Sequence, residues 1–210
     1  MKWEAFYAKF SACSIITPQM VYACGGHDTS LQVQMSRWVK SGKLIKLARE
    51  RYVFSALYQK DTFSEVYIAN HLVYPSYVSL EYALSFFGLI PEAVYSVTSV
   101  TSLRPIKYQT KAGNFTYRHL KKEMFWGYES QSEGMKEAMI ACPEKAILDT
   151  FYFWRGEISQ ARVDEMRFQN LDQINVDKLL QFTEKTKNSK LSKIIHHFLL
   201  PLIHEEKKAA

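Results

Sequence analysis

The spacing of apolar positions in the first 30 residues predicts two short helices. Large aromatic residues recur at positions i, i+3, i+4 and i+7 of the segment 2–12, where they line one helix face: Trp3, Phe6, Tyr7 and Phe10. A second helix begins after an N-cap at Thr17, with Pro18 in its first position. Gly25 and Gly26 follow about two turns later and indicate where this helix ends.

A third helix is expected from a cap at Asp28 to about Ser41, where Gly42 gives a stop signal. Its buried stripe comprises Leu31, Met35, Trp38 and Val39, and its opposite face carries Thr29, Ser30, Val33, Ser36, Arg37 and Lys40. Small polar groups near the start and cations toward the end suit a helix that reads the major groove of DNA. Taken alone, the same pattern fits an ordinary amphipathic surface helix equally well.

The stretch SRWVKSGKLIKLARERYVFS, residues 36–55, favours nucleic acid. Two strand-like runs, LIKLA and RYVFS, are joined by a turn around Arg49-Glu50-Arg51. Three helices followed by a basic hairpin are the element order of a winged helix-turn-helix domain, in which the hairpin lies along the DNA backbone. The cations of this hairpin would each release condensed counterions when placed against a phosphate: Lys43, Lys46, Arg49 and Arg51.

After a weakly patterned junction at 55–63, the rest of the chain predicts an α+β domain. Segments rich in β-branched and aromatic residues predict four or five strands in a small, partly antiparallel sheet: YSVTSVTS, PIKYQT, FTYRHL, MFWGY and KEAMIA. The two segments PIKYQT and FTYRHL flank KAGN and are expected to form a hairpin. We therefore divide the chain into a winged helix-turn-helix domain at 1–60 and an α+β domain at 61–210.

Apolar residues at helical spacing predict further helices around these strands, at 64–72, 80–87, 143–154, 176–187 and 191–205. Ser79 is the expected N-cap of the second of these helices, and Pro143 is well placed in the first position of the third. The last helix contains Pro201, where a kink is expected.

Charge is distributed unevenly along the chain. The first 60 residues hold nine of the 27 Lys and Arg residues but only three of the 21 Asp and Glu residues, so they carry the whole formal charge of +6. Such an asymmetry is expected where the first segment faces a polyanion such as double-stranded DNA. An uneven basic surface that faces only solvent is the alternative interpretation.

Signals for metal, cofactor or membrane binding are weak. The three cysteines have no CxxC spacing, and the adjacent His196 and His197 point in different directions on a helix, so neither set suggests a metal site. No apolar run of 18 residues and no leader-like N-terminus is found. We expect a cytoplasmic protein that needs no metal or cofactor and does not bind a membrane.

Charged residues around one predicted helix offer possible acid, base or anion-binding groups: Arg118, His119, Glu144, Lys145 and Asp149. Lys145 and Asp149 are separated by four residues, however, and a helix salt bridge explains this spacing more simply. The chain has no phosphate-binding loop and no nucleophile elbow. We therefore expect no catalytic residues.

Four stretches, taken in order, resemble the AbiEi-type antitoxins of type IV abortive-infection toxin-antitoxin systems. They are residues 36–55, YPSYVSLEYALSFFGLIPEAVYSVTSVTSLRP, GNFTYRH and ACPEKAILDTFYF, and the resemblance spans 28–155. It implies a winged-helix domain that binds inverted repeats in its own promoter and represses its operon. It also implies a second domain that counteracts a nucleotidyltransferase-like toxin and need not form a stable complex with it.

The resemblance assigns DNA contacts to Arg37, Lys40, Lys43, Lys46 and Arg49. It marks other positions as signature residues of the antitoxin domain without giving them a role: Ser79, Glu81, Arg104, Arg118, His119, Pro143, Glu144, Lys145 and Asp149. Two departures from the family pattern are visible. The hairpin turn lacks the glycine that is common there, and Cys142 stands where Ser or Thr usually caps a helix.

The sequence therefore predicts a sequence-specific DNA-binding repressor that acts as an antitoxin and regulates its own operon. One alternative is a winged-helix transcription factor whose second domain senses a ligand or a partner. A further alternative is a nuclease-like enzyme that uses the basic domain to reach nucleic acid.

Overall fold

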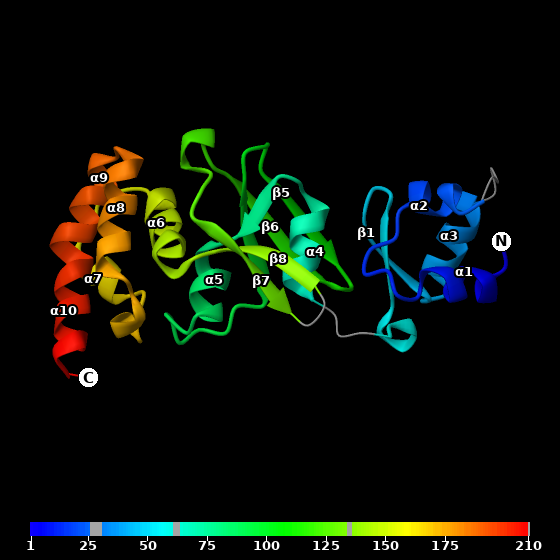
Figure 1. Cartoon of the computed structure of the whole chain (residues 1–210), viewed down its shortest axis with the longest axis horizontal. Helices are drawn as coiled ribbons and strands as arrows, with labels where there is room; N and C mark the ends of the chain where they lie inside the picture. Colours follow the sequence, from blue (N-terminus) through cyan, green and yellow to red (C-terminus); the bar gives the residue numbers. More distant parts are fainter. Residues whose placement is uncertain (26–30, 61–63, 134–135, 210) are drawn as a thin grey trace.

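The computed structural model describes residues 1–25, 31–60, 64–133 and 136–209, and it has a mixed α+β fold. Three groups of elements follow one another along the long axis of the molecule (Figure 1). Short helices lie at the N-terminal end, a six-stranded sheet occupies the middle, and further helices form the C-terminal end. A separate two-stranded hairpin lies between the first helices and the sheet.

The first helices agree with the apolar spacing of the sequence. α1 is Trp3–Phe10, α2 is Pro18–Ala23 and α3 is Leu31–Lys40. Thr17 caps α2 as predicted, because its hydroxyl oxygen accepts a hydrogen bond from the backbone N–H of Met20 at 3.4 Å. Gly25 follows α2 with a φ of 88°, a left-handed conformation that glycine adopts at little cost. The expected cap Asp28 lies outside the described residues.

An apolar core holds these helices against the hairpin. Side chains from every element of this part of the chain contribute to it: Phe6, Phe10, Ile16, Val21, Leu31, Met35, Leu44, Tyr52 and Phe54. Trp38 and Val39 are half-buried and pack against the same core. The buried stripe predicted for α3 is therefore confirmed.

The hairpin consists of β1, Leu44–Ala48, paired antiparallel with β2, Arg51–Phe54. Arg49 and Glu50 form its turn, and Glu50 has a φ of 58°. An isolated antiparallel bridge between Ile16 and Tyr52 attaches the segment before α2 to the outer side of the hairpin. The predicted hairpin is confirmed, and this bridge is an addition that the sequence pattern does not reveal.

Six strands form the larger sheet in the order β5-β6-β4-β3-β8-β7. Their bounds are β3 Ser76–Val78, β4 Ser96–Thr101, β5 Ile106–Thr110, β6 Gly113–His119, β7 Tyr128–Glu133 and β8 Lys136–Ala141. β4 runs parallel to β6 and β3 runs parallel to β8, whereas the other three neighbouring pairs are antiparallel. The sheet is therefore mixed, as expected, but it has more strands than the four or five predicted.

Two strand predictions differ from the structure. β3 is absent from the predicted strands although it lies at the centre of the sheet, because three buried residues are too few to show a period. MFWGY is not a strand. Its first residue, Met124, ends a 3₁₀ turn, η2 at Lys122–Met124, and its last, Tyr128, begins β7, the rest of which the sequence pattern misses. The indole N–H of Trp126 donates to the carbonyl of Glu123 at 2.8 Å.

Helices α4, Glu65–Leu72, and α5, Leu80–Phe86, confirm two predicted helices beside the sheet. The hydroxyl of Ser64 caps α4 by accepting from the N–H of Tyr67 at 3.0 Å. Ser79 stands at the N-cap position of α5, but its side chain makes no capping hydrogen bond, so that part of the prediction is wrong. The hydroxyl is directed instead to Asp149 on α6, Pro143–Phe153.

The C-terminal end contains helices that pack on α6 and on one another. They are α7 Gln160–Asp164, which the sequence pattern misses, α8 Val176–Thr186, α9 Ser189–Ile194 and α10 Leu200–Ala209. A π-helical turn at Ile195–Leu199 joins α9 to α10. Pro201 is the second residue of α10 and has no N–H to donate to the preceding turn, which is consistent with the π-helical turn just before it.

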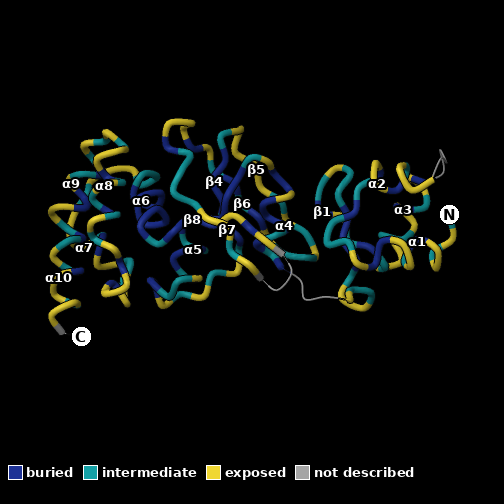
Figure 2. Tube along the Cα trace, in the orientation of Figure 1, coloured by how far each residue is buried: buried dark blue, intermediate teal, exposed yellow. Residues whose placement is uncertain are grey.

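Burial is continuous through the sheet and the helices around it (Figure 2). The core of this larger part also includes residues that precede position 61 in the chain, namely Leu47 of β1 and Val53 of β2. β1 lies close to the edge strand β5, and the hairpin is thus shared between the two cores.

Candidate nucleic-acid interface and buried polar network

α3 presents one polar face to solvent. Leu31 and Met35 are buried on its inner side, and the residues of the opposite face are exposed: Gln32, Val33, Ser36, Arg37 and Lys40. Val33 is 51% exposed, so its methyl groups are accessible to an external apolar group such as the methyl of thymine. Thr29 and Ser30, predicted for the start of the same face, lie outside the described residues.

The hairpin adds two exposed cations next to this helix in the chain. Lys46 on β1 and Arg49 in the turn are exposed to solvent. The turn residue Glu50 occupies a left-handed conformation, and its carboxylate accepts a hydrogen bond from the side-chain amide of Gln19 on α2 at 3.1 Å. The turn therefore forms without the usual glycine, with Glu50 in the position where glycine would be strain-free.

Lys43 and Arg51 lie in different surroundings from the other predicted contacts. The Lys43 ammonium sits 4.7 Å from the centroid of the Trp3 ring, and the side chain is half-buried. Arg51 is also half-buried and lines a cleft between the hairpin and the sheet, together with Tyr74 and Arg104. The structure therefore divides the six predicted cations into an exposed group of four and these two half-buried residues.

The four exposed cations have no internal partner. Within the described ranges, the side chains of Arg37, Lys40, Lys46 and Arg49 make no hydrogen bond and no ion pair. Six cations of the larger part are engaged with carboxylates or backbone carbonyls: Lys145, Arg162, Arg167, Lys178, Lys190 and Lys207. Others there, such as Lys107 and Lys193, are exposed as well. The free positive charge of α3 and the hairpin is thus available to an external anion.

Three of the signature residues meet in a polar network inside the larger core. Asp149 on α6 is fully buried and accepts hydrogen bonds from the hydroxyls of Tyr77 at 2.9 Å and Ser79 at 2.8 Å. Lys145, one turn earlier on α6, donates to the other carboxylate oxygen, and both side chains of this pair are fully buried. The predicted salt bridge is confirmed, and it lies in the core where no solvent screens it.

Aromatic groups surround the Lys145 ammonium. Its Nζ lies 4.9 Å from the centroid of the Trp126 ring and 5.7 Å from that of Tyr77. Gly127 passes so close that an added Cβ would lie 3.1 Å from the Lys145 side chain. The aliphatic stem of Lys145 is therefore enclosed by backbone, and the charged end faces π electrons and one carboxylate.

Burial dominates the ionisation of this pair. It raises the pKa of Asp149 and lowers the pKa of Lys145 from their ordinary values, while their mutual attraction and the two hydroxyl donors act in the opposite direction. A buried ion pair gains little net stability, but removing one partner leaves a charge without compensation. The network therefore makes the relative position of α6, β3 and the start of α5 specific.

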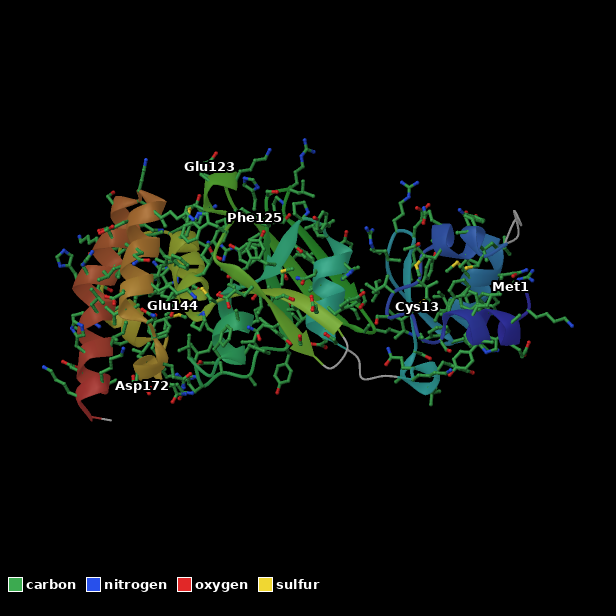
Figure 3. The ribbon with its side chains drawn as sticks, in the orientation of Figure 1. Met1, Cys13, Glu123, Phe125, Glu144 and Asp172 are labelled. Carbon is green, nitrogen blue, oxygen red and sulfur yellow. The ribbon has the colours of Figure 1, made fainter. Side chains whose placement is uncertain are left out.

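Glu144 is buried on the other side of α6. Figure 3 labels Glu144 on this helix. One of its carboxylate oxygens accepts from the backbone N–H of Asn175 at 3.0 Å, and the other lies 3.5 Å from the Nζ of Lys178. Its neighbour Pro143 occupies the first position of α6, as predicted, and Cys142 stands at the N-cap without a side-chain bond. Glu144 thus connects α6 to the start of α8, and it does not join the Asp149 network.

The remaining signature residues lie outside this network. Glu81 and Arg118 line one cleft of about 610 Å³, where the Arg118 guanidinium stacks 4.0 Å from the Phe153 ring centroid. Burial lowers the pKa of Arg118, and the nearby Glu81 carboxylate opposes that change. His119 is exposed, with Nδ1 2.9 Å from the carbonyl of Leu103, and Arg104 lines the cleft beside the hairpin. The signature positions are therefore spread over several sites.

Tyr77 and Trp126 are the network residues that sequence reasoning misses. Tyr77 lies within one of the four stretches that carry the resemblance but has no assigned role there, and Trp126 lies in none of them. Each lies in a segment whose secondary structure the pattern does not predict correctly. The quoted stretch YPSYVSLEY contains Tyr77 two residues before Ser79, and this period-2 spacing is the only local signal that places both side chains on one face of a strand.

Neither the family models nor the curated proteins that were compared with the chain give a match. Within the described residues, no group of three or more His, Cys, Asp or Glu side chains is arranged to hold a metal ion. None of the helices described is long and apolar enough to cross a membrane.

Proposed function

We propose that the protein is a sequence-specific DNA-binding repressor that acts as the antitoxin of a type IV toxin-antitoxin system. In this proposal residues 1–60 are a winged helix-turn-helix unit. α3 enters the major groove, and the hairpin lies along the phosphate backbone. The observation that carries the proposal is the group of four exposed cations on α3 and the hairpin, which have no partner among the residues that the structure describes.

The side chains on the exposed face of α3 are suited to contacts with base edges, and those of the hairpin to contacts with phosphates. Val33 and Ser36 offer a methyl contact and a hydroxyl to base edges, and Arg37 can form a bidentate pair with guanine. Lys46 and Arg49 on the hairpin are suited to phosphates, which fix orientation without reading sequence. The bridge between Ile16 and Tyr52 ties the hairpin to the segment before α2, so that the helices and the hairpin form one unit.

The test is fluorescence anisotropy with duplex DNA from upstream of the protein's own coding sequence. Three phosphate contacts, by Lys40, Lys46 and Arg49, predict that log affinity falls against log salt with a slope of about −3. Arg37→Ala should cost about 1–3 kcal/mol and relax preference at one base position, whereas Lys46→Ala should weaken all duplexes alike and flatten the slope by about one. Lys193→Ala, which removes an exposed cation from α9, is the matched control and should change neither quantity.

Equal losses for Arg37→Ala and Lys46→Ala, without any change in sequence preference, would show that α3 is not the reading helix. Failure of the wild-type chain to bind any duplex at low salt would refute DNA binding altogether. The antitoxin role has a separate test, because it rests on the resemblance: co-expression with the product of a neighbouring nucleotidyltransferase-like gene should restore growth.

A transcription factor whose second part senses a ligand is the second candidate. The specific observation in its favour is the cleft of about 490 Å³ between the hairpin and the sheet, which lies within the usual volume range of ligand sites. The nuclease-like alternative would require cleavage of nucleic acid that is lost with Glu144→Gln or Asp149→Asn.

A further inference from the structure

We propose that the cleft between the hairpin and the sheet binds a nucleotide, a planar ring that carries phosphate groups. The cleft has a volume of about 490 Å³, and its walls come from β2, the segment after α4 and the region that enters β5. This site is distinct from the exposed cations of α3 and Lys46, and it does not depend on whether those residues bind DNA.

Two arginines give the cleft its charge. Arg51 comes from the hairpin and Arg104 from the segment before β5, and none of the lining residues is acidic. In the described parts of the chain, neither guanidinium makes a hydrogen bond or an ion pair. Two cations that share one small cleft repel each other, and an anion bound between them would remove that cost.

Because both cations of the cleft are arginines, the ligand is expected to carry a phosphate or carboxylate group. A guanidinium offers a planar set of donors that matches either group in a bidentate manner, and it is less strongly hydrated than an ammonium. Arg51 is also held in place by its strand. The alternation of β2 puts it on the same face as Val53, which is buried in the larger core. The guanidinium is therefore directed toward the sheet, away from the face that packs on the N-terminal helices.

Aromatic and aliphatic side chains supply a surface for a planar ring. Tyr74 is 84% exposed at the rim, and Tyr108 is half-buried in the wall, where its ring packs edge-on against Tyr117 at 6.2 Å between centroids. Tyr117 is itself fixed, because its hydroxyl donates to the carbonyl of Ala69 at 2.6 Å. Ile106 is 40% exposed in the same wall. Any nucleobase can stack on such rings, because every base has a π face.

The size of the cleft selects a small ligand over a duplex. A volume of about 490 Å³ suits a mononucleotide but is too small for a base-paired helix. Stacking against tyrosine combined with two guanidiniums favours a ring with phosphates over a simple inorganic anion, which would leave the rings unused. The structure therefore indicates a nucleoside mono- or diphosphate as the class of ligand.

The test is isothermal titration of the full chain with adenosine diphosphate, with adenosine and pyrophosphate as separate probes. We expect one site per chain that binds adenosine diphosphate more tightly than either fragment. Arg51→Ala and Arg104→Ala should each weaken binding by tenfold or more, and Tyr74→Ala by a smaller factor. Circular dichroism of each variant confirms that the chain is folded.

Two control variants locate the site. Arg155→Ala removes an exposed arginine elsewhere on the larger part, and Lys187→Ala removes a cation from a second basic cavity lined also by Lys121 and Lys185. Neither should change the affinity for adenosine diphosphate. Loss of binding with Lys187→Ala would place the nucleotide in that second cavity and overturn the proposal, as would absence of binding at millimolar ligand or equal affinity for pyrophosphate alone.

Anisotropy with duplex DNA separates this inference from the proposed function. Arg104→Ala without nucleotide should bind DNA within twofold of the wild-type affinity. Nucleotide binding by a chain that binds no duplex would leave the cleft site standing and refute the repressor. DNA binding by a chain that takes up no nucleotide, or an acidic peptide as the preferred ligand of the cleft, would refute the site and leave the repressor standing.

Discussion

The carboxylate of Asp149 has three donors within reach, from Lys145, Tyr77 and Ser79, in a position that water does not enter. Local sequence predicts only one of these contacts, the pair with Lys145, because four residues bring two side chains together on any helix. The other donors come from β3 and from the residue before α5, about 70 positions earlier in the chain. Long-range partners of this kind leave no periodic signal.

We expect each single substitution in this pair to destabilise the fold strongly. Lys145→Met leaves the Asp149 charge uncompensated and should cost about 3–5 kcal/mol, as should Asp149→Leu. The double variant should cost clearly less than the two single costs added together, because no buried charge remains. Chemical denaturation of the four proteins measures this coupling, and additive costs would show that the side chains act independently.

The loss in free energy of unfolding caused by Lys145→Met should also depend on pH. Burial already raises the pKa of Asp149 in the folded protein, and loss of the ammonium raises it further. A carboxyl whose folded pKa exceeds its unfolded value stabilises the fold at low pH and loses that contribution as pH rises through the folded pKa. The variant should therefore lie closer to the wild type at pH 4 than at pH 7.

Cysteine reactivity offers a second test at this scale. Cys142 is buried at the start of α6, and burial raises the pKa of its thiol to about 11, whereas Cys24 is exposed. A thiol reagent at pH 8 should modify Cys24 quickly and Cys142 only after denaturation, because the thiolate is the reactive form. Rapid modification of Cys142 in the native protein, read by mass spectrometry, would contradict its burial. Cys24→Ser should remove the fast reaction and leave unchanged the reaction of the half-buried Cys13, whose thiol pKa is also raised by burial, and that of Cys142.

Among the elements, those with a sustained period are predicted well and those defined by tertiary contact are not. α3 shows its full stripe over three turns, so its exposed cations could be identified from spacing alone. β3 and α7 are too short for a period, and MFWGY has the aromatic content of a strand but turns at Gly127. Arg51 illustrates the limit for the candidate site. The alternation of β2 puts Arg51 and Val53 on one face, but only the packed sheet reveals what that face meets.

The hairpin turn yields a prediction at the scale of the element. Glu50 holds a left-handed conformation that costs a non-glycine residue about 1–2 kcal/mol. Glu50→Gly removes this strain, the bond to Gln19 and one negative charge. Stability should therefore change by less than about 1 kcal/mol, since the entropy cost of glycine offsets the relief. Affinity for duplex DNA should rise at low salt. A fall in affinity would show that the carboxylate orders the turn for binding, and Glu50→Gln separates charge from conformation.

The whole molecule carries its charge asymmetrically, and its two proposed activities can be separated by substitution. A full-length chain with Lys46→Ala and Arg49→Ala should lose repression of its own promoter. The same chain should still restore growth against a co-expressed toxin when both genes are transcribed from unrelated promoters. A reporter assay and a growth curve measure the two outcomes. Loss of rescue would show that antitoxin action requires the cationic surface.

At the scale of the whole molecule, the uneven distribution of charge can be predicted from the sequence, but the arrangement of the two apolar cores cannot. A boundary near residue 60 is natural for a pattern that lapses at 55–63. In the structure the strands before this point contribute to both cores, with Leu44 in the first and Leu47 in the second. Only three-dimensional contact can reveal such double use of one hairpin.

Because the hairpin contributes side chains to both cores, the sheet can move little relative to a hairpin that is bound to DNA. Tilting the hairpin along a groove would have to carry the sheet and the C-terminal helices with it, because Leu47 and Val53 are buried among their side chains. Two copies on a palindrome would then stand at an angle dictated by this joint. The spacing between half-sites that the protein accepts would then depend on the packing of Leu47 and Val53, because no flexible linker would adjust it.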